Sequence, residues 1–146
     1  MWNIFGNSDP KSKKVVQWEK EHHQLKKLAG LIIGAYDNKD FKETKKQLNK
    51  LKDVALNHLM GEDITFYEMK REVGDKEKDV FDAVSEFETS FREVKIVLIK
   101  FLDHYSRPEV ELDQEFKETF DTIVGVLVAR IEFEEANLYA MLDRSA

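Results

Sequence analysis

Apolar residues recur along this chain at steps of three and four, the spacing that places them on one face of an α-helix. Four segments carry this period, separated by polar or helix-breaking residues near 37–40, 74–75 and 106–108. Helices joined by such short connections pack as antiparallel neighbours, so the pattern predicts an all-α, up-down-up-down four-helix bundle. The predicted inward positions, segment by segment, are Val15, Trp18, His22, Leu25, Ala29, Ile32 and Tyr36; Phe41, Leu48, Leu51, Ala55, His58, Glu62, Phe66 and Met69; Val80, Val84, Phe87, Phe91, Val94, Leu98 and Phe101; and Phe116, Phe120, Ile123, Leu127, Arg130, Glu134, Leu138 and Met141.

The length and composition favour a single domain of this kind. The chain has 146 residues, of which 42% are hydrophobic and 36% are charged, a mixture typical of amphipathic helices with solvated outer faces. Six glycines and two prolines are few for an all-β fold. We expect residues 15–146 to form the bundle and residues 1–14 to form a flexible N-terminal tail.

Several classes of protein are excluded or disfavoured. The chain has no cysteine, which excludes disulfides and thiolate metal sites. It has no apolar run long enough for a signal peptide or a membrane span, so we expect a cytoplasmic protein without a membrane partner. The net charge of −6 argues against nucleic-acid binding. No phosphate loop or nucleophile motif is present, and we therefore do not expect an enzyme.

Five polar residues interrupt the predicted apolar stripes: His22, His58, Glu62, Arg130 and Glu134. Burial of such groups is costly unless they are paired, hydrogen-bonded or bound to a metal. Counted from the turn near residue 39, His22 lies 17 residues before it and His58 lies 19 residues after it. Similar counts from the other two turns bring all five residues to one layer of an antiparallel bundle.

The same count tests the third helix and the remaining histidine. The layer reaches residues 86–90 of that helix, where Ser90 lies nearest the inward stripe. His104 lies close to the last turn and about 27 Å from the level of Glu134, which excludes it as a ligand of the same site.

Three segments resemble the hemerythrin-like (HHE) family. His58-Leu59-Met60-Gly61-Glu62-Asp63, followed by Phe66-Tyr67, is similar to the second-helix motif of that family, in which a His and a Glu four residues later are ligands. Residues 21–25 resemble the first-helix ligand segment, and residues 130–135 with 138–139 resemble the fourth-helix segment. The resemblance covers nearly the whole predicted bundle.

The resemblance implies a site for two non-haem irons that bind or sense oxygen or store iron. The matching ligand positions are His22, His58, Glu62 and Glu134, with His23 in place of His22 if the first helix is slightly rotated. Two expected histidines are missing. Arg130 occupies the fourth-helix position and Ser90 the third-helix position.

The ligand set is therefore incomplete, and its metal content is left open. Arg130 is permanently cationic and cannot bind a metal, but its guanidinium could hydrogen-bond to Glu62 and Glu134 and supply the positive charge. One or two iron ions, or no metal at all, are compatible with these residues. We narrowly favour a metal- or oxygen-responsive binding domain.

The alternative is a metal-free bundle that binds a protein partner. The Rsd/AlgQ anti-sigma regulators, also helical bundles, resemble this chain at Trp18 with Glu21 and His23, at Tyr67-Glu68, and at Ala129-Arg130 with Glu134. This match is shorter, and the chain lacks the Gly-His pair expected before Tyr67. It implies a transcription regulator as the second interpretation.

Overall fold

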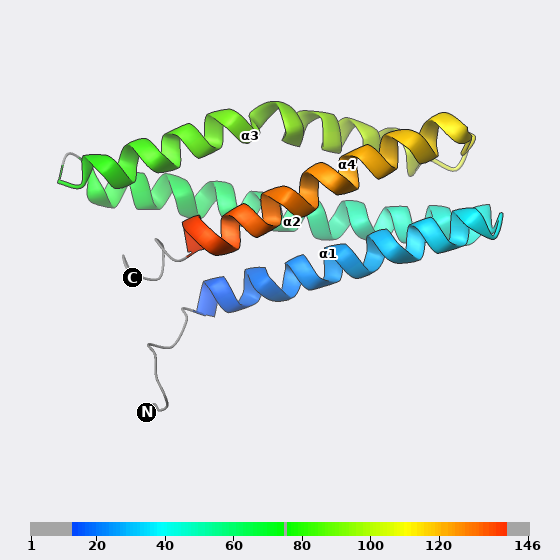
Figure 1. Cartoon of the computed structure of the whole chain (residues 1–146), viewed down its shortest axis with the longest axis horizontal. Helices are drawn as coiled ribbons and strands as arrows, with labels where there is room; N and C mark the ends of the chain where they lie inside the picture. Colours follow the sequence, from blue (N-terminus) through cyan, green and yellow to red (C-terminus); the bar gives the residue numbers. More distant parts are fainter. Residues whose placement is uncertain (1–12, 75, 140–146) are drawn as a thin grey trace.

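Four long helices alternate in direction and lie side by side (Figure 1). The computed structural model describes residues 13–74 and 76–139. The helices are α1 (Lys13–Asp37), α2 (Phe41–Val73), α3 (Lys78–Tyr105) and α4 (Gln114–Phe133), and α4 continues into the short π-helical segment η1 (Glu134–Leu138). The predicted all-α, up-down-up-down bundle is therefore confirmed.

The bounds of the elements bear on two sequence predictions. Residues 1–12 of the predicted tail and Met141 of the fourth stripe lie outside the described residues, and α1 begins at Lys13.

The α2–α3 hairpin extends beyond the start of α1 and the end of η1, which lie at the same end of the bundle (Figure 1). Within the described ranges, no helix has both the length and the apolar character that a membrane span requires.

The helix ends follow from local capping. The Asp40 side chain accepts a hydrogen bond from the backbone N–H of Glu43 at 3.1 Å and so caps the N-terminus of α2. Asp113 caps α4 in the same way, through the N–H of Phe116 at 2.9 Å. Gly74 ends α2 with a φ of 47°, a conformation that L-residues with a Cβ rarely adopt. Short polar turns therefore separate the helices where the pattern of breaks predicted them.

The connection between α3 and α4 is held by a lysine from another helix. Lys45 of α2 points its ammonium group at this loop and donates hydrogen bonds to the carbonyl oxygens of Tyr105, at 2.8 Å, and Arg107, at 2.6 Å, and to that of Val110. Burial lowers the pKa of Lys45, while Glu109 opposes the shift. This contact fixes the end of α3 and the following connection against α2.

The core is divided into two apolar clusters by a layer of polar side chains. The larger cluster fills the half of the bundle near the α1–α2 turn and includes Ile32, Leu48 and Phe116. The smaller cluster consists of Val15, Trp18, Phe66, Met69, Val84, Phe87 and Tyr139. Buried His22, His58, Glu62 and Glu134 lie between the two. The predicted inward stripes are thus largely confirmed.

One predicted core position is wrong. Phe41 is 45% exposed, because it is the first residue of α2 and lies at the end of the bundle, where its ring contacts that of Tyr36 with centroids 5.7 Å apart. The helical period carries no information about where the core ends.

Candidate metal centre

Four predicted ligands converge at one point in the interior of the bundle. One donor atom from each of His22, His58, Glu62 and Glu134 lies within 4.8 Å of the donor atoms of the other three. The two histidine Nε2 atoms are 3.0 Å apart. Glu134 Oε1 is 3.1 Å from His22 Nε2, and Glu62 Oε2 is 3.3 Å from His58 Nε2. The chain thus brings two imidazoles and two carboxylates together from α1, α2 and η1.

A second ring of carboxylates orients both histidines. His58 Nδ1 donates a hydrogen bond to Glu21 at 2.7 Å, and His22 Nδ1 donates one to Glu135 at 3.1 Å. When Nδ1 carries the proton, a neutral imidazole has its lone pair on Nε2, the atom that faces the centre. Metal-binding histidines are almost always held in this way by a carboxylate or carbonyl. Each histidine is therefore presented as a ligand.

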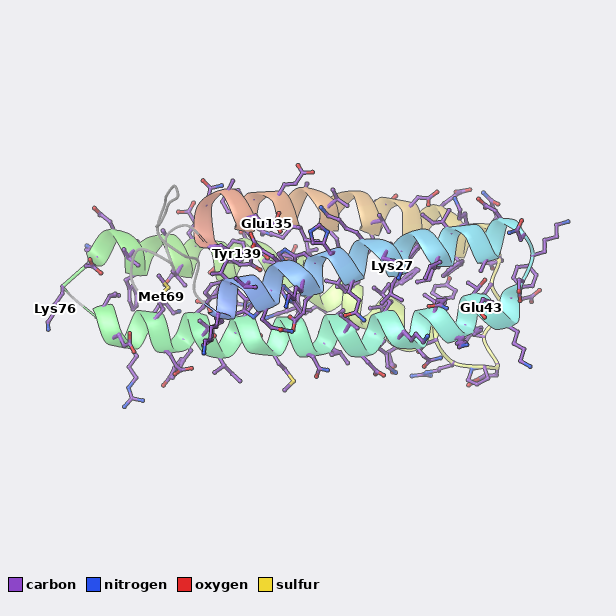
Figure 2. All side chains as sticks on the ribbon, turned by 90° about the horizontal axis from the view of Figure 1, so that it is seen from below. Lys27, Glu43, Met69, Lys76, Glu135 and Tyr139 are labelled. Carbon is purple, nitrogen blue, oxygen red and sulfur yellow. The ribbon has the colours of Figure 1, made fainter. Side chains whose placement is uncertain are left out.

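Tyr139 contributes a hydroxyl group to the same cluster. Its hydroxyl donates a hydrogen bond to Glu62 Oε2 at 2.7 Å and lies 3.1 Å from Glu134 Oε1 and 3.0 Å from His22 Nε2. The ring stacks on His22 and packs against Trp18. Figure 2 shows Tyr139 and Glu135 close together where η1 passes the first half of α1.

The π-helical segment explains why Tyr139 faces the centre. The backbone N–H of Tyr139, the residue that follows η1, bonds to the carbonyl of Glu134, five residues earlier. Tyr139 therefore returns to the helix face that Glu134 occupies. A regular α-helix would return to that face after four residues, at Leu138, whose side chain is not described. Single turns of π-helix occur frequently at functional sites.

The ionisation of the cluster is set by burial and by contacts among its members. Burial would lower the pKa of His58, but hydrogen bonds with Glu134 and Glu62 outweigh it and raise the pKa to about 10. Burial would raise the pKa of Glu134, yet hydrogen bonds from His22 and His58 lower it to about 2. Burial and the charge of Glu134 raise the pKa of Glu62 to about 7, against the effect of His58. Without a metal, the centre is held together by protons on His58 and Glu62.

Tyr139 remains protonated over the pH range in which Glu134, Glu62 and His58 titrate. Burial, followed by the charges of Glu62 and Glu134, strongly raises the pKa of its hydroxyl. It therefore acts as a hydrogen-bond donor to the carboxylates.

The predicted contact of Arg130 with the carboxylates is wrong. Its guanidinium lies over the rings of Phe87 and Phe91, at 4.3 Å and 4.6 Å from their centroids, and donates a hydrogen bond to the Ser90 hydroxyl at 3.1 Å. Among the described residues, no carboxylate oxygen lies within 4.0 Å of it. Phe87 and Phe91 attract the guanidinium through the faces of their rings, and this keeps it on the α3 side of the bundle.

Ser90 does not face the centre either. It is exposed at the edge of α3, where its hydroxyl donates to the carbonyl of Phe87 at 2.9 Å. The inward face of α3 at this level is formed by Phe87 and Phe91. Helix α3 therefore supplies no ligand to the cluster.

The four donor atoms fit one ion. Ligand atoms about 2.1 Å from a common metal lie about 3.4 Å apart in a tetrahedron and about 3.0 to 4.2 Å apart in an octahedron. The observed separations, between 3.0 and 4.0 Å for four of the pairs and below 4.8 Å for all, require only small side-chain movements. A second ion would need further ligands, and the aromatic rings and Arg130 occupy the side from which α3 would supply them.

A comparison with protein-family models also points to cation binding. The model for the hemerythrin HHE cation-binding domain matches residues 14–142. The chain belongs to the hemerythrin HHE family. Searches of curated proteins and of solved structures found no match.

The structure completes this HHE domain in ways the sequence did not predict. His22 faces the interior and His23 is exposed, which decides between the two alternatives. The supporting roles of Glu21, Glu135 and Tyr139 were missed, although all three lie in the segments that carry the resemblance. Glu21 and Glu135 each adjoin a ligand in sequence and bond to the histidine of another helix, a relationship that spacing within one helix does not reveal.

Proposed function

We propose that this HHE domain binds a single transition-metal ion through His22, His58, Glu62 and Glu134. The observation that carries the proposal is the pair of histidine–carboxylate contacts, Glu135 with His22 and Glu21 with His58. They hold both Nε2 atoms at the same point as the two buried carboxylates. A purely structural histidine pair would not need both rings to direct Nε2 at buried carboxylates.

Iron(II) is the metal we expect. Two imidazoles and two carboxylates, with no thiolate, form a donor set that suits non-haem iron, and the family resemblance implies the same metal. Bound iron supplies one-electron chemistry, which would make the domain responsive to oxygen. The additional groups at the centre hold the ligands in place: Glu21 bonds to His58, Glu135 to His22, and the Tyr139 hydroxyl to Glu62. We therefore propose a binding or sensing role rather than an enzymatic one.

Metal content is the direct test. The full chain is produced in iron-supplemented medium, purified without a chelator and analysed by elemental analysis and by titration of the metal-free protein with Fe(II), Mn(II) and Zn(II). We expect one ion per chain. Two ions per chain would contradict the single-ion proposal, and no retained or titratable ion would contradict metal binding altogether.

Matched variants show whether the ion occupies this cluster. His22→Ala and Glu134→Gln are expected to lose the ion, with folding checked by circular dichroism. His23→Ala is the control, because this exposed histidine is the sequence neighbour of His22. Equal metal loss in the His23 variant would place the ion elsewhere.

A partner-binding role is a second candidate, supported by the outer face of α2. Met60, Ile64 and Tyr67 follow each other at helical spacing and are 60%, 57% and 63% exposed. Contiguous exposed apolar patches on soluble proteins can mark sites of protein–protein interaction. For the anti-sigma version, RNA polymerase subunits are expected to co-purify with the wild type and to be lost in Tyr67→Asp, with Val97→Asp as an exposed apolar control. If no RNA polymerase subunit co-purifies with the wild-type protein, the anti-sigma interpretation is wrong.

A further inference from the structure

An elongated apolar cavity of about 280 Å³ extends from the candidate metal centre toward the α1–α2 turn. Its lining runs from His22 to Ile33 along α1, a rise of about 16 Å. Leu127 and Phe120 of α4 and Phe91 of α3 form much of its apolar wall. The cavity is thus larger than the space that a single metal ion at its end would fill.

The cavity has the size and the lining of a ligand site. It is about twice the volume of an engineered apolar cavity of roughly 150 Å³ that stays dry and binds benzene. The four buried polar ligands and Arg130 lie at one end, and apart from Lys26 the remaining wall is aliphatic and aromatic. Its elongated form fits a flexible hydrocarbon chain better than a compact ring.

Two exposed residues of α1 lie along the lining and mark where it reaches solvent. They are Lys26 and Gly30, one helical turn apart. Among the described residues, no carboxylate oxygen lies within 4.0 Å of the Lys26 ammonium group. The cavity therefore opens beside a cation that has no anionic partner among residues 13–74 and 76–139.

We propose that this cavity binds a medium-chain carboxylate, with its alkyl chain along the bundle axis and its carboxylate at Lys26. The opposite orientation would bring the ligand's negative charge against the buried carboxylates of Glu62 and Glu134. Arg130 also lines that end, but its guanidinium lies over the Phe87 and Phe91 rings and donates to Ser90. The alkyl chain instead extends from Lys26 toward Phe120, away from that end. This site is independent of the metal proposal, because Lys26 and the apolar wall are in place without an ion.

Titration calorimetry with decanoate tests the site on the full, metal-free chain. We expect saturable binding of one decanoate, and no binding of butyrate, which is too short to fill the cavity. Gly30→Leu is expected to abolish decanoate binding because the new side chain fills the opening. An added Cβ at Gly30 meets no atom within 4 Å and the backbone φ is not positive, so the variant should fold and gain helix propensity.

Gly34→Leu is the matched control. Gly34 lies one turn further along α1, has the same free space around an added Cβ and does not line the cavity. Wild-type and Gly34→Leu proteins are expected to bind decanoate equally. Absence of decanoate binding to the wild type, or equal binding by Gly30→Leu, would overturn the proposal.

A second pair of variants tests the position of the carboxylate. Lys26→Met is expected to weaken decanoate binding about three- to fivefold, the upper part of the range for an exposed ion pair, and to leave decanol binding unchanged. Lys27→Met is the control, because Lys27 is the next residue of α1 (labelled in Figure 2) and does not line the cavity. Equal effects of Lys26→Met on the two ligands would overturn the proposed orientation. Decanoate binding without metal binding, or the reverse, would separate this proposal from the proposed metal function.

Discussion

The Nε2 atoms of His22 and His58 face each other at 3.0 Å in the interior of the bundle. Two imidazole lone pairs would repel each other at this distance, so a proton has to lie between them. The pKa of His58, raised to about 10, assigns that proton to His58. A metal ion has to displace it, which couples metal binding to pH.

The metal-free protein is therefore expected to lose stability as the pH rises. The folded-state pKa of His58 exceeds its usual value of 6.5, so its contribution is fully present below pH 6.5 and is lost as the pH approaches about 10. The raised pKa of Glu62 acts in the same direction between its usual 4.5 and about 7. Urea unfolding with a chelator should show a fall of roughly 2–4 kcal/mol between pH 6.5 and 10.

With metal bound, the contribution of the centre to stability should change with pH in the opposite direction. Because the ion requires His58 and Glu62 to be deprotonated, its stabilising effect should increase with pH. His58→Gln is the control and should remove most of the pH dependence of the metal-free protein over that interval. A flat profile in the wild type would mean that His58 is not protonated in the fold.

Removal of the outer carboxylates should weaken metal binding without removing a ligand. Glu21→Gln and Glu135→Gln retain an oxygen that can accept the histidine hydrogen bond but lose its charge. We expect affinity to fall about tenfold for each, at the lower end of the range for such partners. Competition with a chromophoric chelator measures the effect, and Glu132→Gln, at an exposed neighbouring position, should bind as the wild type does.

Tyr139→Phe separates a hydrogen-bond donor from a metal ligand. The substitution leaves the buried Glu62 without its 2.7 Å donor and should lower the stability of the metal-free protein by about 1–3 kcal/mol. Because the strongly raised pKa of Tyr139 keeps its hydroxyl protonated, metal stoichiometry should stay at one ion. If the variant loses the ion while remaining folded, Tyr139 is a ligand.

Arg130→Met tests whether the arginine neutralises the centre. Its observed contacts are with Phe87, Phe91 and Ser90, so loss of the cation should cost about 1–2 kcal/mol and leave the metal stoichiometry unchanged. A loss of about 3–5 kcal/mol, typical of a broken buried ion pair, would instead show that Arg130 pairs with Glu62 or Glu134. Arg92→Met, at an exposed position of α3, controls for loss of charge.

Lys45→Met should loosen the α3–α4 connection. Three backbone carbonyls lose their ammonium donor, at an expected cost of about 1–2 kcal/mol because the site is only half-buried. Limited proteolysis should then cleave the 106–113 segment faster than in the wild type. Lys46→Met is the control, since Lys46 is exposed and neighbours Lys45. Equal cleavage in the two variants would contradict a specific role of Lys45.

The sequence by itself determined the helices, their order and the level at which the polar residues meet. Helical periodicity depends only on spacing along the chain, and the rise per residue converts a count from each turn into depth. These two relationships are sufficient to predict that His22, His58, Glu62 and Glu134 lie in one layer, as the structure shows. They also excluded His104, which the structure places in the last turn of α3.

Only the tertiary structure decided which groups surround those four residues. Rotation of α1 buried His22 rather than His23, and the π-helical turn brought Tyr139 to the centre. Contacts across helices paired Glu21 with His58 and Glu135 with His22. Packing against Phe87 and Phe91 drew Arg130 away from the carboxylates. These outcomes depend on side-chain packing between helices, and the spacing of residues within one helix does not specify it.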